Sequence, residues 1–160
     1  MGSSFVFYSP WRQCAEHVPA APAARAAPRG AATIASVADA RVLLVEDDEA
    51  LRTLLRRVLE RAGCAVESAR DGAEALRVFD DGARFAAAVL DVGVPPEGAL
   101  PTLRALRARS AGLAAILISG SPPDDEVRTL LRDGRSAFLS KPFAPADLTR
   151  ALAALGAGPR

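Results

Sequence analysis

The chain has 160 residues, half of them hydrophobic, which is enough length and apolar content for one ordinary domain with a sizeable core. Lys and Arg total 20 and Asp and Glu total 19, and this near-zero net charge argues against a dedicated nucleic-acid-binding protein. No apolar run approaches the roughly 18–20 residues that a membrane-spanning helix needs, so we expect no membrane association.

Residues 1–38 differ in composition from the rest of the chain. Residues 20–30 form a low-complexity stretch rich in Ala, Pro and Arg. Its prolines oppose a regular helix, and its small side chains offer little to bury, so we expect a disordered N-terminal tail. Two alternatives stay open. Translation could begin later, for example at Val37, or the aromatic side chains of residues 5–11 could serve as a docking peptide.

From residue 39 onward, five short apolar runs alternate with five segments of helical periodicity. A continuous apolar run is typical of a parallel strand that is buried on both faces, and apolar residues spaced three or four apart indicate an amphipathic helix. The predicted strands are 42–45, 64–69, 85–90, 113–118 and 136–140. The predicted helices follow them at 51–62, 75–79, 100–106, 127–131 and 148–155.

This alternation predicts a single doubly wound α/β domain over residues 39–156. Right-handed crossovers place helices on both faces of a five-stranded parallel sheet. Only residues 157–160 follow, as a short tail, so we expect a stand-alone domain with no output domain attached.

Polar residues stand where four of the strands end, and the carboxyl ends of parallel strands are where ligands bind in such folds. The first strand leads into Glu46 and Asp47, the third into Asp91, the fourth into Ser119 and the fifth into Lys141. Carboxylates this close together repel unless a cation lies among them, and an all-oxygen acidic site suits Mg²⁺. Acids before a helix also favour its N-terminus in any protein, but capping does not explain the whole set.

Four sequence blocks carry a resemblance to a known family. They are Val-Leu-Leu-Val-Glu46-Asp47-Asp48-Glu, Val-Leu-Asp91-Val-Gly-Val-Pro95, Ile-Leu-Ile-Ser119-Gly120 and Phe138-Leu-Ser-Lys141-Pro142-Phe143. Over about residues 40–155 the chain resembles the CheY-like receiver domain of two-component response regulators. The Ser119-Gly120 and Phe138-Leu-Ser-Lys141-Pro142-Phe143 blocks are most similar to those in receivers of hybrid sensor kinases. The resemblance implies a flavodoxin-like strand order of 2-1-3-4-5 with five helices.

The resemblance also implies a role for each of these residues. Asp91 would accept a phosphoryl group, Lys141 would pair with it, and Ser119 would hydrogen-bond the phosphoryl oxygens. Ser119 and the aromatic Phe138 would form the conformational switch. The implied magnesium ligands are Glu46, Asp47, Asp91 and the backbone carbonyl of Gly93.

The implied partners are a histidine kinase or histidine phosphotransfer protein and an unknown downstream protein. The chain would be a monomer, or a weak dimer through the fourth helix, fifth strand and fifth helix. We expect no enzymatic activity beyond self-phosphorylation and self-dephosphorylation. The two cysteines, Cys14 and Cys64, form neither a disulfide framework nor a zinc motif, which indicates a cytoplasmic protein.

Two departures from the family pattern keep an alternative open. Glu46 replaces the more usual Asp, and the loop after Asp91 has Gly93 one residue early and Pro96 where Gly is common. The chain could therefore be a pseudo-receiver that is never phosphorylated and acts as a protein-binding scaffold. An Asp-nucleophile phosphatase is disfavoured because Asp91-Val-Gly93 lacks the second acid of that motif.

Overall fold

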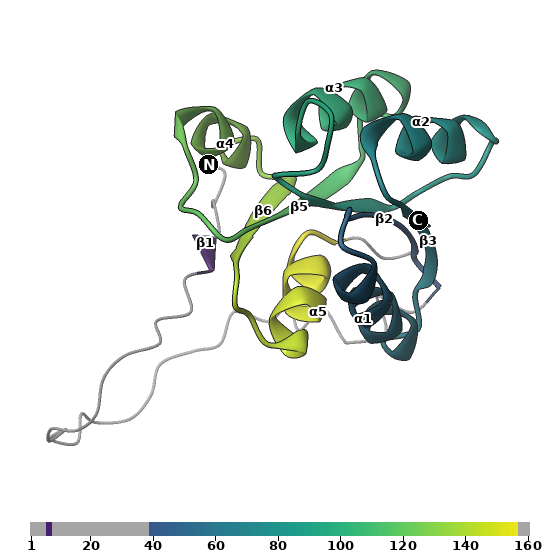
Figure 1. Ribbon diagram of the computed structural model, residues 1–160, viewed down its shortest axis with the longest axis horizontal. Helices are drawn as coiled ribbons and strands as arrows, with labels where there is room; N and C mark the ends of the chain where they lie inside the picture. Colours follow the sequence, from purple (N-terminus) through teal and green to yellow (C-terminus); the bar gives the residue numbers. More distant parts are fainter. Residues whose placement is uncertain (1–5, 8–38, 157–160) are drawn as a thin grey trace, which may run out of the picture.

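The computed structural model describes residues 6–7 and 39–156, and its centre is one parallel sheet (Figure 1). The strands are β1 (Val6–Phe7), β2 (Arg41–Val45), β3 (Ala65–Ala69), β4 (Ala87–Asp91), β5 (Ala114–Ser119) and β6 (Ser136–Ser140). All pairings are parallel, and the order across the sheet is β1-β6-β5-β4-β2-β3. The five predicted strands are β2 to β6, so the predicted order 2-1-3-4-5 is confirmed.

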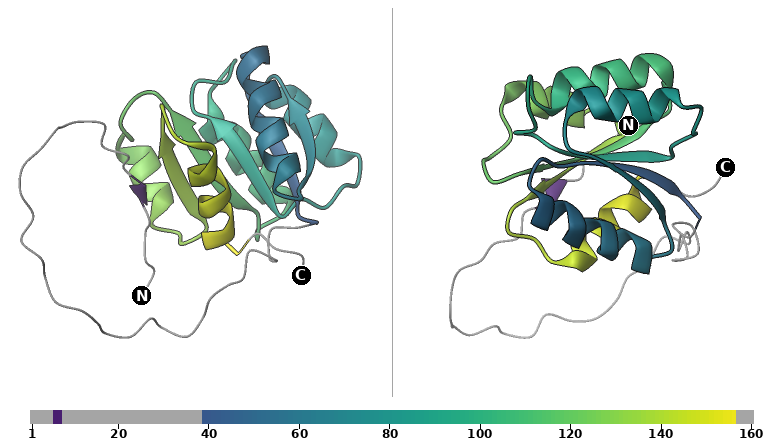
Figure 2. Two further views of the ribbon diagram at one scale, coloured as in Figure 1. Left: turned by 90° about the horizontal axis from the view of Figure 1, so that it is seen from below. Right: turned by 45° about the vertical axis from the view of Figure 1, so that its right-hand side comes forward.

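Helices cover both faces of the sheet, as Figures 1 and 2 show. The helices are α1 (Glu49–Arg61), α2 (Gly72–Asp80), α3 (Ala99–Arg109), α4 (Asp125–Leu131) and α5 (Pro145–Ala154). Helices α1 and α5 lie on one face, and α2, α3 and α4 lie on the other. No helix in the described part of the chain is long and apolar enough to cross a bilayer.

The alternation of side chains along β2 explains why the strands read as unbroken apolar runs. Val42 and Leu44 pack into the core beneath α1 and α5, whereas Leu43 and Val45 pack into the core beneath α2, α3 and α4. All four side chains are fully buried. Both faces of a central strand must therefore be apolar, which removes the polar alternation seen in a half-exposed sheet.

The sequence analysis predicted a tail without regular structure before residue 39, and β1 corrects that prediction at two positions. Val6 and Phe7 pair with the outer edge of β6 as a sixth strand. An open sheet edge offers backbone donors and acceptors to any extended segment, and Val6 and Phe7, two residue types that are common in strands, fill that role. The rest of the predicted tail, 1–5 and 8–38, and residues 157–160 lie outside the described residues.

Candidate functional site

The predicted site residues meet at the edge of the sheet where β2, β4, β5 and β6 end. Glu46 and Asp47 directly follow β2, and Asp91 is the last residue of β4. Ser119 is the last residue of β5, and Lys141 directly follows β6. The parallel topology thus brings residues up to 95 positions apart in sequence to one edge.

Three carboxylates form a compact cluster there. One oxygen each from Glu46, Asp47 and Asp91 lies within 4.8 Å of the others. Lys141 Nζ lies 3.3 Å from Glu46 Oε2 and 3.4 Å from Asp91 Oδ1. With all groups ionised, three negative charges therefore face a single ammonium group. A divalent cation fits this residue set, because it brings the missing positive charge and prefers carboxylate oxygens.

The electrostatics of Glu46 reflect that imbalance. Its side chain is only 2% exposed, although it carries an ionisable group. Burial raises the pKa of Glu46 above its ordinary value, and the neighbouring charge of Asp91 raises it further. The ammonium of Lys141 and the Asp48 backbone N–H, which donates to Glu46 Oε1 over 3.3 Å, oppose the shift without cancelling it.

The consecutive acids that begin at Glu46 have two different structural roles, helix capping and formation of the carboxylate cluster. Asp48 caps α1, because its Oδ1 accepts a hydrogen bond from the Leu51 N–H over 2.8 Å. Glu46 and Asp47 instead turn towards Asp91. The capping interpretation of the acids therefore applies to Asp48, and the cluster interpretation applies to the two residues before it.

Arg52 is a site residue that the sequence analysis did not identify. Its Nη1 donates to the backbone carbonyl of Glu46 over 2.8 Å and to that of Asp47 over 3.2 Å. The guanidinium thereby ties the first turns of α1 to the backbone of the acidic loop. The helical pattern places Arg52 among the arginines of the exposed face. Its only distinguishing signal is its place five and six residues after the two acids.

Ser119 and Phe138 lie on β5 and β6, whose ends border the carboxylate cluster, but their side chains make contacts outside the cluster. The Ser119 carbonyl accepts from the Lys141 N–H over 2.8 Å, which joins the ends of β5 and β6. The Ser119 hydroxyl accepts from the Ser121 N–H over 3.1 Å. Phe138 is 2% exposed and packs in the core beneath α2, α3 and α4. Within the described residues, no hydrogen bond joins the Ser119 hydroxyl to the three carboxylates.

The loop after Asp91 is compact around Gly93. The Val94 N–H donates to the Asp91 carbonyl over 3.2 Å, and the Gly98 N–H donates to the Val94 carbonyl over 2.8 Å. A Cβ at Gly93 would lie 3.7 Å from Asp91 Oδ2, so Gly93 leaves open space beside that oxygen. The predicted role of the Gly93 carbonyl as a metal ligand stays a prediction.

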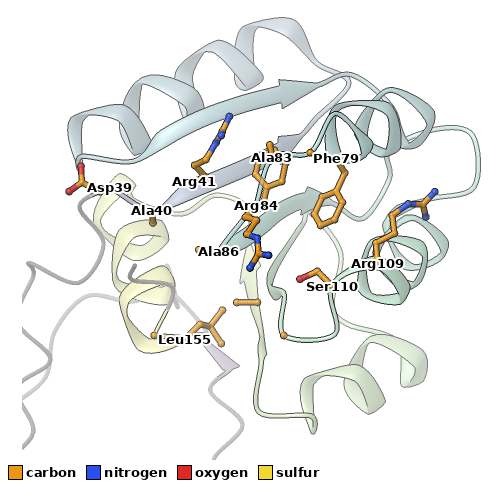
Figure 3. A pocket seen from close by; sticks show the side chains of 15 residues that line it. Asp39, Ala40, Arg41, Phe79, Ala83, Arg84, Ala86, Arg109, Ser110 and Leu155 are labelled. Atoms are coloured by element: carbon orange, nitrogen blue, oxygen red, sulfur yellow. The ribbon is translucent and has the colours of Figure 1, made fainter. Parts of the chain in front are cut away.

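A cavity of about 720 Å³ lies elsewhere, at the edge where the strands begin (Figure 3). Its apolar wall includes Phe79 and Leu155. Two of its arginines already have carboxylate partners, since Arg41 pairs with Glu67 and Arg109 pairs with Asp80. This cavity shares no lining residue with the acidic cluster, so we assign the candidate site to the cluster alone.

Comparisons with known proteins agree on one family. A family model for the response regulator receiver domain matches residues 42–153. The response regulator MprA of Mycobacterium sp. (strain KMS) is 37% identical over 115 residues, covering 72% of this chain and 50% of MprA. The protein PetR of Rhodobacter capsulatus is 35% identical over 113 residues, covering 71% of this chain and 47% of PetR. The chain thus matches about half the length of these curated relatives.

Solved structures give the same result. The chemotaxis protein CheY4 of Vibrio cholerae is 29% identical with a TM-score of 0.64, covering 72% of this chain and 97% of CheY4. The response regulator TrrA of Thermotoga maritima, solved in complex with Mg²⁺ and BeF, is 25% identical with a TM-score of 0.62. That match covers 72% of this chain and 98% of TrrA.

Proposed function

Because the chain belongs to the response regulator receiver domain family of two-component signalling, we propose that Asp91 accepts a phosphoryl group from a phosphohistidine. The donor would be a histidine kinase or a histidine phosphotransfer protein in the cytoplasm. One observation carries the proposal: the Asp91 carboxylate contacts the ammonium of Lys141 and lies in one cluster with the carboxylates of Glu46 and Asp47, at the carboxyl ends of the strands.

In the proposed reaction, an Asp91 carboxylate oxygen attacks phosphorus and forms an acyl phosphate. The bond from phosphorus to the donor's imidazole nitrogen breaks, and its electron pair stays on that nitrogen. Such a transfer needs positioning and charge neutralisation more than covalent help. Lys141 is positioned for this, because its Nζ lies 3.4 Å from Asp91 Oδ1 and would neutralise the arriving phosphoryl oxygens. Gly93 leaves Asp91 Oδ2 unobstructed by a side chain.

Glu46, Asp47 and Asp91 are the residues that would hold Mg²⁺, together with the Gly93 carbonyl that the resemblance implies. A bound magnesium ion supplies positive charge for the phosphoryl oxygens. Buried Glu46 contributes negative charge from the protein side, and Arg52 fixes the backbone that carries Glu46 and Asp47.

The signal would pass through Ser119 and Phe138. Phosphorylation adds roughly 1.5–2 negative charges and new acceptor oxygens. The Ser119 hydroxyl would donate to them in place of its local contact with the Ser121 N–H. Because the Ser119 carbonyl accepts a hydrogen bond from the backbone N–H of Lys141, just after β6, this change would reach the strand that carries Phe138. A downstream protein, still unknown, would recognise the altered surface. We propose no turnover of other substrates.

The decisive experiment is the intact mass of the full chain after incubation with acetyl phosphate and Mg²⁺. We expect a gain of one phosphoryl group that chelation abolishes and that Asp91→Asn lacks. Asp125→Asn, which changes a fully exposed carboxylate on α4, is the matched control and should be phosphorylated normally.

A silent result would require a second measurement, because some receivers accept phosphoryl groups only from their kinase. Beryllofluoride with Mg²⁺ would then be titrated against the amide spectrum. If neither treatment changed the protein, the phosphoacceptor proposal would be wrong. The scaffold alternative, which the unusual loop after Asp91 favours, would replace it.

A further inference from the structure

The outer edge of β6 is covered by a distant part of the same chain. Val6 lies opposite Phe138, and Phe7 lies opposite Leu139. Figure 1 shows β1 alone at this end of the sheet, beyond β6. An uncovered edge strand is a template for pairing with any extended segment, so this pairing satisfies backbone groups that could otherwise pair with another chain.

The hydrogen-bond pattern of β6 identifies which of its residues face that edge. The Ala115 N–H donates to the Arg135 carbonyl, and the Lys141 N–H donates to the Ser119 carbonyl. Alternate residues of a parallel strand face the same neighbour, so residues 135, 137, 139 and 141 direct their backbone groups to β5. The N–H and C=O of Phe138 therefore face the opposite way, towards β1.

We propose that the edge of β6 is a strand-docking surface. In the unbound protein the chain's own Val6–Phe7 segment occupies it and pairs with the backbone of Phe138. The kind of partner that fits this surface is an extended strand running parallel to β6. Any downstream protein or second copy that adds a strand there must first displace Val6–Phe7. This last consequence rests on the proposed signalling function, but the docking itself does not.

Two features make the docking reversible and intramolecular. A strand of two residues makes few ladder bonds, and the cost of ordering its backbone is close to what those bonds return. The intervening residues 8–38, about 30 in number, could reach roughly 100 Å if fully extended, so the tether permits the contact within one molecule. A tether of this length also gives the segment an effective concentration far above that of a second protein molecule in dilute solution.

Amide hydrogen exchange resolved by NMR tests this proposal on the full chain without any phosphodonor. The variant is Val6→Pro with Phe7→Pro, because in this register Phe7 directs its N–H at β6 and proline lacks that N–H, while a second proline at position 6 further disfavours strand pairing. Ala24→Pro is the matched control, with a proline added elsewhere in the N-terminal region. We expect the Phe138 amide to exchange at least fivefold faster in the double variant, which equals about 1 kcal/mol of lost protection. The amides of Ala137 and Leu139, which face β5, should not change.

Each other outcome would overturn the proposal. An unchanged Phe138 amide would mean that no strand docks there. Equal acceleration at residues 137, 138 and 139 would indicate general destabilisation instead of an uncovered edge. If protection of Phe138 rose with protein concentration, the occupant would be a second copy. Because the measurement does not involve Asp91, its failure and that of the phosphoacceptor proposal are distinguishable.

Discussion

Charged side chains are arranged differently at the two ends of the parallel strands. At the edge where strands begin, Arg41 and Arg109 each have one carboxylate partner. Where the strands end, three carboxylates form one cluster, and the ammonium of Lys141 contacts two of them, Glu46 and Asp91. Paired charges near the surface are close to neutral for stability, whereas gathered like charges are costly. The costly arrangement is the one that calls for a functional explanation.

The largest effect should come from removing the ammonium group of Lys141, which contacts two carboxylates of the cluster. Lys141→Met keeps much of the side-chain volume but loses the ammonium group 3.4 Å from Asp91 Oδ1. We expect phosphorylation by acetyl phosphate to slow by about 100-fold or more, the scale typical of losing one preorganised electrostatic contact. A time course of intact mass measures this. Lys141→Arg should recover only part of the rate, because a planar guanidinium does not replace a compact charge. A Met variant as fast as the parent would contradict the assigned role.

A second variant tests the cost of the gathered charge directly. Glu46→Gln removes one buried negative charge with little change in shape. In chelator at neutral pH we expect the variant to be more stable than the parent by about 1 kcal/mol, a usual size for a single substitution. Mg²⁺ should bind it more weakly, so that added Mg²⁺ raises its melting temperature less.

The pH dependence of that difference has a definite sign. The pKa of Glu46 is raised in the fold, so the folded chain holds the proton more tightly than the unfolded chain does. The parent therefore loses stability as pH rises from the ordinary carboxyl value near 4.5 through the raised value. The gain of Glu46→Gln should be nearly absent below that window and constant above it. Urea unfolding at several pH values in chelator measures it, and a gain largest in acid would refute this electrostatic account.

A smaller effect is expected from Arg52, which supports the carboxylate cluster through the backbone of two of its residues. Arg52→Gln removes the donor to the carbonyls of Glu46 and Asp47 but leaves every carboxylate in place. We expect Mg²⁺ affinity, measured by calorimetry, to fall several-fold, within or below the roughly 10–100-fold range for groups that orient metal ligands. Arg56→Gln is the control, since Arg56 pairs with Glu60 on the exposed side of α1. Equal affinities for the two variants would remove Arg52 from the site.

The sequence predicted the helices, the strands and the position of the candidate site. Local apolar patterns indicate the elements, and in a parallel sheet the carboxyl ends of all strands lie on the same side. Apolar runs placed the strands, and parallel pairing then forced Asp91 and Lys141 together. It could not predict β1, because two residues pair there only where β6 leaves an open edge. Nor could it predict Arg52, whose helical position resembles that of its exposed neighbours. The division of the acidic run, with Asp48 as a cap, depends on where α1 begins, and local sequence specifies that point only loosely.

The smallest effect should come from the opposite edge. Arg109 contacts both carboxylate oxygens of Asp80, at 2.6 and 3.2 Å, and the two side chains are 40% and 54% exposed. Exposed pairs of this kind contribute about 0.2–1 kcal/mol, so Arg109→Gln should lower the free energy of unfolding by no more than that. The loss should shrink in 1 M salt, where charges are screened within about 3 Å. Phosphorylation and Mg²⁺ affinity should match the parent, because the pair lies at the far end of the strands. A change in either would mean that the two edges are coupled through the sheet, and charge at one could then not be interpreted independently of the other.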